Sequence, residues 1–218
     1  MTDTDPTVEA VPLVLLHGAG QAPMAWEDVV VALYGSRRLL TPWVPGLRPT
    51  EKDLVALPAA AATLDTDLML EGMAQVDLCG LSLGAMVATQ LAADFPERVR
   101  RLVLIAGQVR PPRALLKVQT GVMRMIPASR FADSGVSKTR LLQMLAASNE
   151  VDLTDALPRI TAPTLVLVGS RDKANLPGAR ALADGIPGAR LRVVAGAGHA
   201  LNQEAPEVLV SILEDFLG

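Results

Sequence analysis

The chain has 218 residues, of which 50% are hydrophobic and 20% are charged, and its formal net charge is −3. This length corresponds to one domain that can bury a full core without a stabilising metal, and the single cysteine, Cys79, excludes an intramolecular disulfide framework. The nearly balanced charge gives no general electrostatic reason to bind nucleic acid, so no nucleic-acid partner is expected.

The first ten residues, MTDTDPTVEA, are acidic and polar. A secretory signal would instead begin with a basic stretch followed by an apolar run, so we expect a cytoplasmic protein. The longest weakly polar stretch, 54–64, is interrupted by Pro58 and is shorter than the ~20 residues that a membrane-spanning helix needs. No membrane partner is therefore expected.

Short apolar runs alternate with helical patterns along the first half of the chain. Such nearly continuous runs are typical of strands buried on both faces, as in parallel sheets. Strands are predicted at Val11–Leu16, Arg38–Trp43, Val76–Cys79 and Arg101–Ala106. Helices are predicted at 23–35, at 51–74 with a break or kink at Pro58, and at Leu83–Phe95.

The same alternation resumes near the C-terminal end of the chain. Strands are predicted at Pro163–Val168 and Arg190–Val194, and helices near 177–186 and at Ala205–Leu217. Strict alternation of strand and helix predicts an α/β fold, with a doubly wound, mostly parallel sheet of about six strands and helices on both faces.

The alternation fails between residues 107 and 162. This segment contains no strand-like run and is predicted to form amphipathic helices, including Arg113–Ile126 and Lys138–Ala147. We therefore divide the chain into a core, 1–106 and 163–218, and an insertion, 107–162.

The sequence GLSLG, residues 80–84, joins a predicted strand to a predicted helix. A nucleophile elbow needs a strained turn at such a junction, with small residues two positions before and after the nucleophile so that neighbouring backbone can pack closely. The N-terminus of the next helix offers free N–H groups and its positive dipole end to a developing oxyanion. The pattern favours Ser82 as a catalytic nucleophile over a glycine-rich turn without a catalytic role.

A serine hydroxyl needs a general base, and the chain has two histidines. His199 lies in the glycine-rich segment GAGH after the last predicted strand, and His17 ends the first strand in LLHGAG. The carboxyl ends of parallel strands line one edge of a sheet, where ligands bind, and Ser82 lies at the same edge. We predict that His199 is the general base and that His17 has a structural role in the turn that follows it.

The third residue must be a carboxylate that orients the histidine and stabilises its protonated form. Asp172 follows the predicted strand PTLVLV in the segment GSRD, again at the carboxyl edge. A solvated turn aspartate paired with Arg171 or Lys173 is the alternative interpretation. Asp77 and Asp94 are poorer candidates, because one lies within a strand and the other at the far end of a helix.

With the elbow GLSLG, the acid loop VGSRD, the histidine loop GAGHALNQEAPE and HGAG after the first strand, the sequence resembles the α/β-hydrolase superfamily over nearly the whole chain. The resemblance implies the α/β-hydrolase fold, and it implies that 107–162 is a lid over the site. It also implies an oxyanion hole made by the backbone N–H groups of Leu83 and Ala19, with Gly20 as a less favoured donor. Only about ten residues precede Val11, too few for the antiparallel hairpin that usually begins this fold.

Pocket residues are harder to assign from sequence. Trp26 and Trp43 lie near the predicted site and are expected to bind substrate, although core packing explains them equally well. The predicted lid carries flexible aliphatic side chains that could accept a modest acyl chain or pack the lid onto the sheet. These are Leu115, Leu116, Val122, Met123, Met125, Ile126, Leu141, Leu142 and Met144.

The same segment is rich in basic residues. Between Gln108 and Glu150 the acidic residues are Asp133 and Glu150. The basic residues in this range are Arg110, Arg113, Lys117, Arg124, Arg130, Lys138 and Arg140. Such a lid could attract anionic substrates, but a solvated helix face is the more usual meaning of such a pattern.

The residues therefore predict a serine hydrolase that cleaves carboxylic ester or thioester bonds of a small soluble substrate through an acyl-enzyme. Alternatives with the same three residues are carbon–carbon bond hydrolysis, enol-lactone opening or a lyase reaction on a carboxylated metabolite. A non-catalytic ligand-binding protein is a further alternative. Two histidines and one cysteine are too few for a zinc site, and no metal or cofactor is expected.

Overall fold

The computed structural model describes residues 10–48, 50–51, 56–127, 137–147 and 150–218. A six-stranded sheet in the order β2-β1-β3-β4-β5-β6 forms its centre, and every recorded strand pair is parallel. The strands are β1 (Leu13–Leu16), β2 (Leu39–Leu40), β3 (Val76–Leu81), β4 (Val99–Ile105), β5 (Thr164–Gly169) and β6 (Arg190–Val194). The predicted fold class is confirmed.

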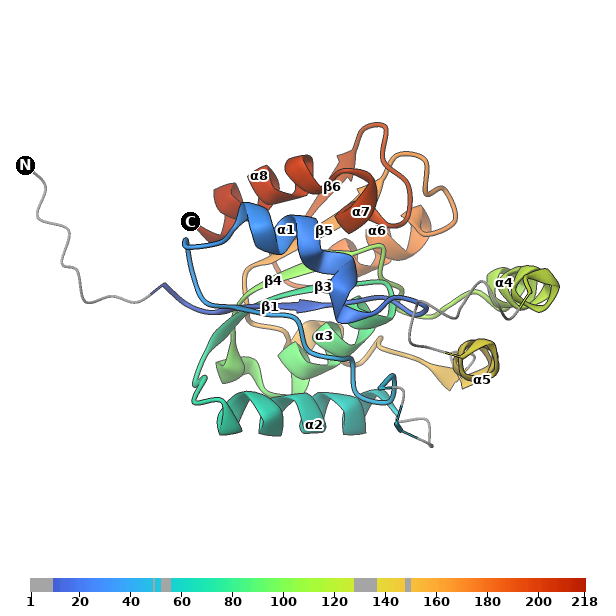
Figure 1. Ribbon diagram of the computed structural model, residues 1–218, viewed down its shortest axis with the longest axis horizontal. Helices are drawn as coiled ribbons and strands as arrows, with labels where there is room; N and C mark the ends of the chain where they lie inside the picture. The colour runs from blue at the N-terminus through green and yellow to red at the C-terminus, as the bar shows by residue number, and fades with distance from the viewer. Residues whose placement is uncertain (1–9, 49, 52–55, 128–136, 148–149) are drawn as a thin grey trace, which may run out of the picture.

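Helices cover both faces of the sheet (Figure 1). One face carries α1 (Glu27–Ala32) and α8 (Pro206–Leu217), and the other carries α2 (Leu57–Leu70), α3 (Leu83–Asp94) and α6 (Leu176–Gly185). No helix in the described part of the chain is both long and apolar enough to cross a membrane.

The apolar strand β1 shows why the sheet needs helices on both sides. All four of its residues are buried, and successive side chains point to opposite faces. Leu13 and Leu15 pack in one apolar cluster with Trp26, while Val14 and Leu16 pack in the other with residues of α2 and α3. Neither face of this strand could be left in water without a large hydrophobic penalty.

Several element bounds differ from the predictions. The strand predicted at Arg38–Trp43 is reduced to Leu39–Leu40, because Pro42 has no N–H to donate to a strand ladder. Pro58 lies in the first turn of α2 and does not kink it, since the first turn does not need that N–H. The rest of the helix predicted from residue 51 includes 52–55, which lie outside the described residues.

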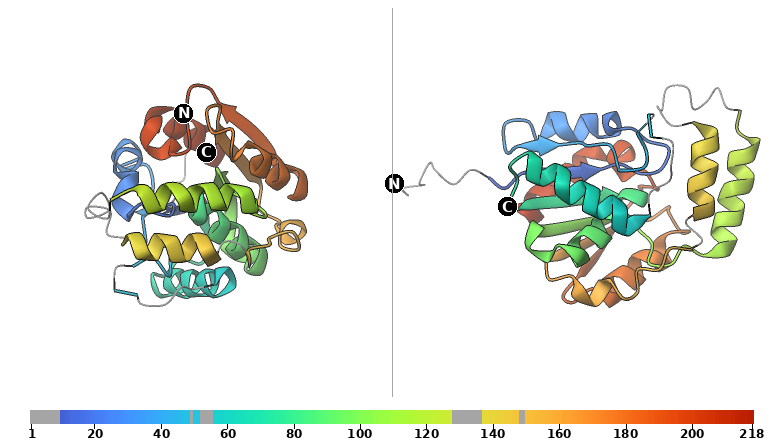
Figure 2. Two further views of the ribbon diagram at one scale, coloured as in Figure 1. Left: turned by 90° about the vertical axis from the view of Figure 1, so that its right-hand side faces the viewer. Right: turned by 90° about the horizontal axis from the view of Figure 1, so that it is seen from below.

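The inserted helices are α4 (Arg113–Met125) and α5 (Lys138–Ala147), which follow β4 and precede β5 in the sequence. They lie side by side beyond the carboxyl ends of the strands (Figure 2). Lys138 Nζ donates to the carbonyl of Ile126 at 2.6 Å, which ties the two helices together. The buried Arg140 guanidinium donates to the carbonyl of Gly46, which ties α5 to the loop after β2.

Candidate active site

Ser82 lies in a strained turn between β3 and α3. Its backbone has φ 54° and ψ −111°, in the left-handed region that non-glycine residues seldom adopt. The turn fits because its glycine neighbours lack side chains. A Cβ on Gly84 would overlap the carbonyl oxygen of Leu16 and lie 2.7 Å from that of His17. The close packing of the neighbouring backbone therefore keeps Ser82 in this strained conformation at the carboxyl edge of the sheet.

Asp172 and His199 meet at the same edge from two different loops. Asp172 follows β5, His199 follows β6, and His199 Nδ1 lies 2.8 Å from Asp172 Oδ2. Asp172 is buried, whereas the His199 side chain is 45% exposed. A histidine held in this way by Nδ1 has its Nε2 free to accept a proton.

The carboxyl of Asp172 is kept ionised by its hydrogen bonds. Burial alone opposes the charged form, but hydrogen bonds from His199 and Asn175 outweigh it, so the pKa of Asp172 lies below its ordinary value. The Asn175 amide donates to both carboxylate oxygens, at 2.8 and 2.9 Å. Asp172 is therefore a charged partner for His199 at neutral pH.

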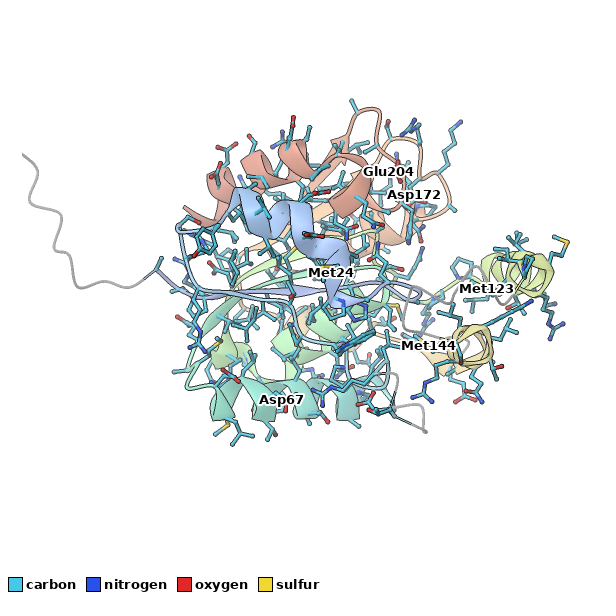
Figure 3. The ribbon with its side chains drawn as sticks, viewed as in Figure 1. Met24, Asp67, Met123, Met144, Asp172 and Glu204 are labelled. Carbon is cyan, nitrogen blue, oxygen red and sulfur yellow. The ribbon has the colours of Figure 1, made fainter. Side chains whose placement is uncertain are left out.

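The histidine loop is held by Glu204, at the end of the short helix α7 (Leu201–Glu204). Its carboxylate accepts hydrogen bonds from the backbone N–H groups of Gly198 at 2.8 Å and Ala200 at 3.1 Å, one on each side of His199. Arg171, next to Asp172, also donates to Glu204. Figure 3 shows Glu204 and Asp172 close together at the edge of the sheet nearest α4 and α5.

Ser82 and His199 line one cavity of about 340 Å³. No hydrogen bond between these two side chains is recorded in the part of the chain that the structure describes. Catalytic hydrogen bonds of unliganded enzymes often tighten only when substrate binds, and the shared cavity gives both groups access to one substrate. The inserted helices close the cavity with Leu116, Val118, Val122, Met123, Leu141 and Met144.

Ala19 and Leu83, the expected oxyanion donors, also line this cavity. Leu83 is the first residue of α3, so its N–H has no partner within the helix. The β1 loop lies against the elbow, since a Cβ on Gly18 would be 3.4 Å from Ser82 Cβ. Both residues that are expected to supply oxyanion donors thus border the cavity that Ser82 lines.

His17 is fully buried below this loop and does not line the cavity. Its Nδ1 donates to the carbonyl of Gly18 at 3.0 Å, and its Nε2 accepts the N–H of Val44 at 3.2 Å. Burial lowers its pKa below the ordinary value, and the hydrogen bond to Gly18 only partly opposes that shift. This arrangement fits a neutral histidine that joins the β1 loop to the loop after β2.

The buried His17 is expected to make the fold sensitive to acid. An unfolded histidine takes up a proton near pH 6.5, whereas the folded pKa is lower, so the unfolded state binds more protons below that pH. The free energy of unfolding should then fall on acidification from pH 6.5 to the folded pKa, by at most about 1.4 kcal/mol per pH unit. Urea unfolding at several pH values measures this slope.

The chain offers a matched control, since His199 is its other histidine. His17→Gln should flatten the pH dependence of unfolding in this range, whereas His199→Gln should leave most of it in place. An unchanged slope in His17→Gln would contradict the expectation.

Neither tryptophan reaches the cavity that contains Ser82. Trp26 is fully buried among residues of α8 and β1, and its indole N–H has no partner among the described residues. Trp43 packs on the other core cluster and stands edge-on to His17, with ring centroids 5.2 Å apart. Both side chains therefore have packing contacts, and their contact with substrate stays a prediction.

Three of the seven basic residues of the insertion are used in local contacts. Arg110 pairs with the exposed Asp152, and Lys138 and Arg140 donate to backbone carbonyls. Arg130 and Asp133 lie outside the described residues. Of the basic side chains that the structure describes in this segment, Arg110, Lys117, Arg124, Lys138 and Arg140, none lines the cavity, which favours a structural or solvated role over attraction of anionic substrates.

Asp77, one of the poorer acid candidates, and the single cysteine, Cys79, do not line the cavity. Asp77 is fully buried and accepts hydrogen bonds from Arg37 at 2.9 Å and Arg100 at 2.6 and 2.8 Å, near the start of β3 and away from the cavity. Cys79 is fully buried, and burial raises the pKa of its thiol. A thiol held in its neutral form in the core is unreactive.

Sequence reasoning missed Asn175 and Gln108, which also line the cavity. Asn175 is three residues after Asp172, in the loop that was already assigned to the site, and this spacing could have drawn attention to it. No sequence motif marks Gln108, because only the fold brings it close to the loop that contains Asp172 and Asn175.

Comparison with known proteins agrees with this geometry. Residues 13–212 match the model of the Alpha/beta hydrolase family. The pimeloyl-(acyl-carrier protein) methyl ester esterase of Aromatoleum aromaticum is 29% identical, over 94% of this chain and 97% of that protein. The biotin biosynthesis bifunctional protein BioHC of Cellvibrio japonicus is 28% identical over 94% of this chain, which spans only 47% of that protein's length.

Solved structures show the same fold. The crystal structure of a hydrolase from Pseudomonas aeruginosa superimposes with a TM-score of 0.83 and 24% identity, covering 98% of this chain and 92% of that one. Because the family model extends over most of the sequence, from β1 into α8, the chain belongs to the alpha/beta hydrolase family.

Proposed function

We propose that the protein is a serine hydrolase that cleaves carboxylic ester or thioester bonds of a small soluble substrate through an acyl-enzyme. The observation that carries the proposal is that the strained Ser82 and His199, which is bound to Asp172, line the same cavity. A nucleophile held in a strained turn and a histidine held by a carboxylate at the same cavity are the groups that acyl transfer requires.

In the acylation step, Ser82 Oγ attacks the substrate carbonyl carbon while His199 Nε2 takes the hydroxyl proton. The carbonyl oxygen becomes an oxyanion that accepts hydrogen bonds from the N–H groups of Leu83 and Ala19. When the tetrahedral intermediate collapses, the bond to the leaving alcohol or thiol breaks. The leaving group takes the proton from His199, and the acyl group stays on Ser82.

Deacylation repeats these events with water. His199 removes a proton from water as the water oxygen bonds to the acyl carbon, and the Ser82 ester bond then breaks. The serine recovers its proton from His199, and the carboxylic acid leaves. Asp172 stays ionised throughout and stabilises the protonated imidazole.

The cavity supports a small apolar acyl or alcohol group. Its volume of about 340 Å³ is within the usual range for small-molecule sites, and most side chains contributed by α4 and α5 are aliphatic or methionine. The methyl ester esterase relative supports ester chemistry at a site of this kind. No residue of the proposal requires a metal or cofactor.

Labelling with a fluorophosphonate probe tests the activated serine without knowledge of the substrate. We expect Ser82 Oγ to bond to phosphorus with loss of fluoride, and mass spectrometry should place the adduct on this residue. No adduct on the native protein would overturn the proposal and favour a ligand-binding role.

A panel of p-nitrophenyl esters of increasing acyl length tests the bond class. We expect turnover to fall once the acyl chain exceeds what the cavity holds. Labelled protein that hydrolyses no ester or thioester but cleaves a carboxylated diketone or an enol-lactone would replace ester hydrolysis with that chemistry.

A further inference from the structure

Asn175 has an unusual position for a buried asparagine. It is the N-cap residue of α6, where an asparagine side chain commonly accepts an N–H from the first helical turn, yet it makes no capping hydrogen bond. Its amide is directed to the acid loop instead, with Nδ2 2.8 Å from Asp172 Oδ1 and 2.9 Å from Oδ2. The helix thus forgoes a cap while the carboxylate gains a donor.

A second amide fixes which end of Asn175 faces the carboxylate. Gln108 Nε2, from the loop after β4, donates to Asn175 Oδ1 at 2.7 Å. An ionised carboxylate only accepts hydrogen bonds, so Asp172 requires the Nδ2 end, and Gln108 binds the opposite end. The side chains form a series of hydrogen bonds that runs from Gln108 through Asn175 and Asp172 to His199. The first three of these residues are 6–8% exposed.

The packing around Gln108 makes room for this series of hydrogen bonds. Gly178, in the first turns of α6, leaves the space that Gln108 occupies, because a Cβ there would lie 2.6 Å from Gln108 Cδ and 2.8 Å from the carbonyl oxygen of Gly107. Gln108 and Asn175 also line the cavity with Ser82 and His199. The series of hydrogen bonds therefore connects the start of the inserted segment to Asp172 and His199.

From this geometry we infer that Asn175, held by Gln108, is a positioning residue that fixes the Asp172 carboxylate so that Oδ2 faces His199. The inference rests on the proposed function. Without its side-chain amide, position 175 keeps only a backbone hydrogen bond to the Asp172 carboxyl, and Oδ1 loses the side-chain donor at 2.8 Å, so the carboxylate can rotate away from the imidazole. Asn175 Nδ2 lies 3.1 Å from His199 Nδ1 because both groups donate to one carboxylate.

The test compares Asn175→Ala, Asn175→Asp and Gln108→Leu with the wild-type protein. Asn175→Ala should lower kcat for a p-nitrophenyl ester and the rate of fluorophosphonate labelling by about 10- to 100-fold, the range for hydrogen bonds to a charged group, with little change in KM. Gln108→Leu should also lower kcat and the labelling rate, but by a smaller factor than Asn175→Ala. Asn175→Asp should lose at least as much as Asn175→Ala, because it puts a second carboxylate against Asp172.

A spectroscopic readout separates positioning from packing. The Nδ1 proton of His199, shared with Asp172, should give a strongly deshielded 1H NMR signal that weakens or shifts in Asn175→Ala at temperatures well below the melting transition of that variant. If Asn175 only filled space, the nearly isosteric Asn175→Asp would be the milder change. Gln90→Ala is the matched control, since it removes another amide donor to a carboxylate, Asp94, away from this pair.

The outcomes distinguish this inference from the proposed function. A labelled wild-type protein whose Asn175→Ala variant reacts at the same rate, with an unchanged Nδ1 signal, would overturn the positioning role alone. An unlabelled wild-type protein would overturn the proposed function. The NMR comparison would still decide whether Asn175 positions Asp172 and His199, because it does not depend on turnover.

Discussion

Replacement of Ser82 or His199 by alanine is expected to lower kcat by about 10⁴-fold or more, since each change removes the proposed nucleophile or its base. Ser82→Ala keeps the Cβ, so it adds no new atom to the tight turn. The melting temperature should therefore change little. Steady-state turnover of the best p-nitrophenyl ester measures the loss.

The double variant gives the sharper result. Residues that act as one unit are grossly non-additive, so Ser82→Ala combined with His199→Ala should be little slower than either single variant. The activity that remains would come from the oxyanion donors and from substrate binding. Losses that multiply in the double variant would mean that the two residues act independently, against the proposed mechanism.

The elbow and the two later loops could be predicted from sequence because each depends on local pattern. Ser82 stands between a buried apolar run and a helical pattern with glycines at both flanks, and the structure gives it the positive φ that such a junction requires. Asp172 and His199 each follow an apolar strand. In a parallel sheet, strand ends share one edge, so topology alone brings these residues together.

Features that depend on distant contacts were not predictable. Trp26 lies close in sequence to the HGAG turn, but its side chain joins an apolar cluster that includes residues of α8, almost two hundred residues away in the chain. Gln108 and Asn175 are 67 residues apart and carry no motif. The length of β2 depends on how many residues of this edge segment can pair with β1 before Pro42. Local strand propensity does not determine that number.

Gly84→Ala is expected to destabilise the fold by about 3 kcal/mol or more, at the upper end of the usual cost of overpacking. The added methyl would overlap the main-chain carbonyl of Leu16, at the end of β1, and would lie 2.7 Å from both Leu16 C and His17 O. Backbone in a central strand cannot move aside as a flexible side chain can. Either β1 or the start of α3 must shift, and the Ser82 turn would shift with it.

Gly121→Ala makes the same chemical change without the steric conflict. Gly121 lies within α4 with no heavy atom within 4 Å of an added Cβ, and alanine favours a helix interior by about 0.5–1 kcal/mol over glycine. Urea unfolding should therefore show a lower midpoint for Gly84→Ala and an equal or higher one for Gly121→Ala. Labelling of Ser82 should slow only in the first variant, because only that methyl presses on the elbow. Equal midpoints for the two variants would show that the close approach of β1 to α3 is not what confines the nucleophile.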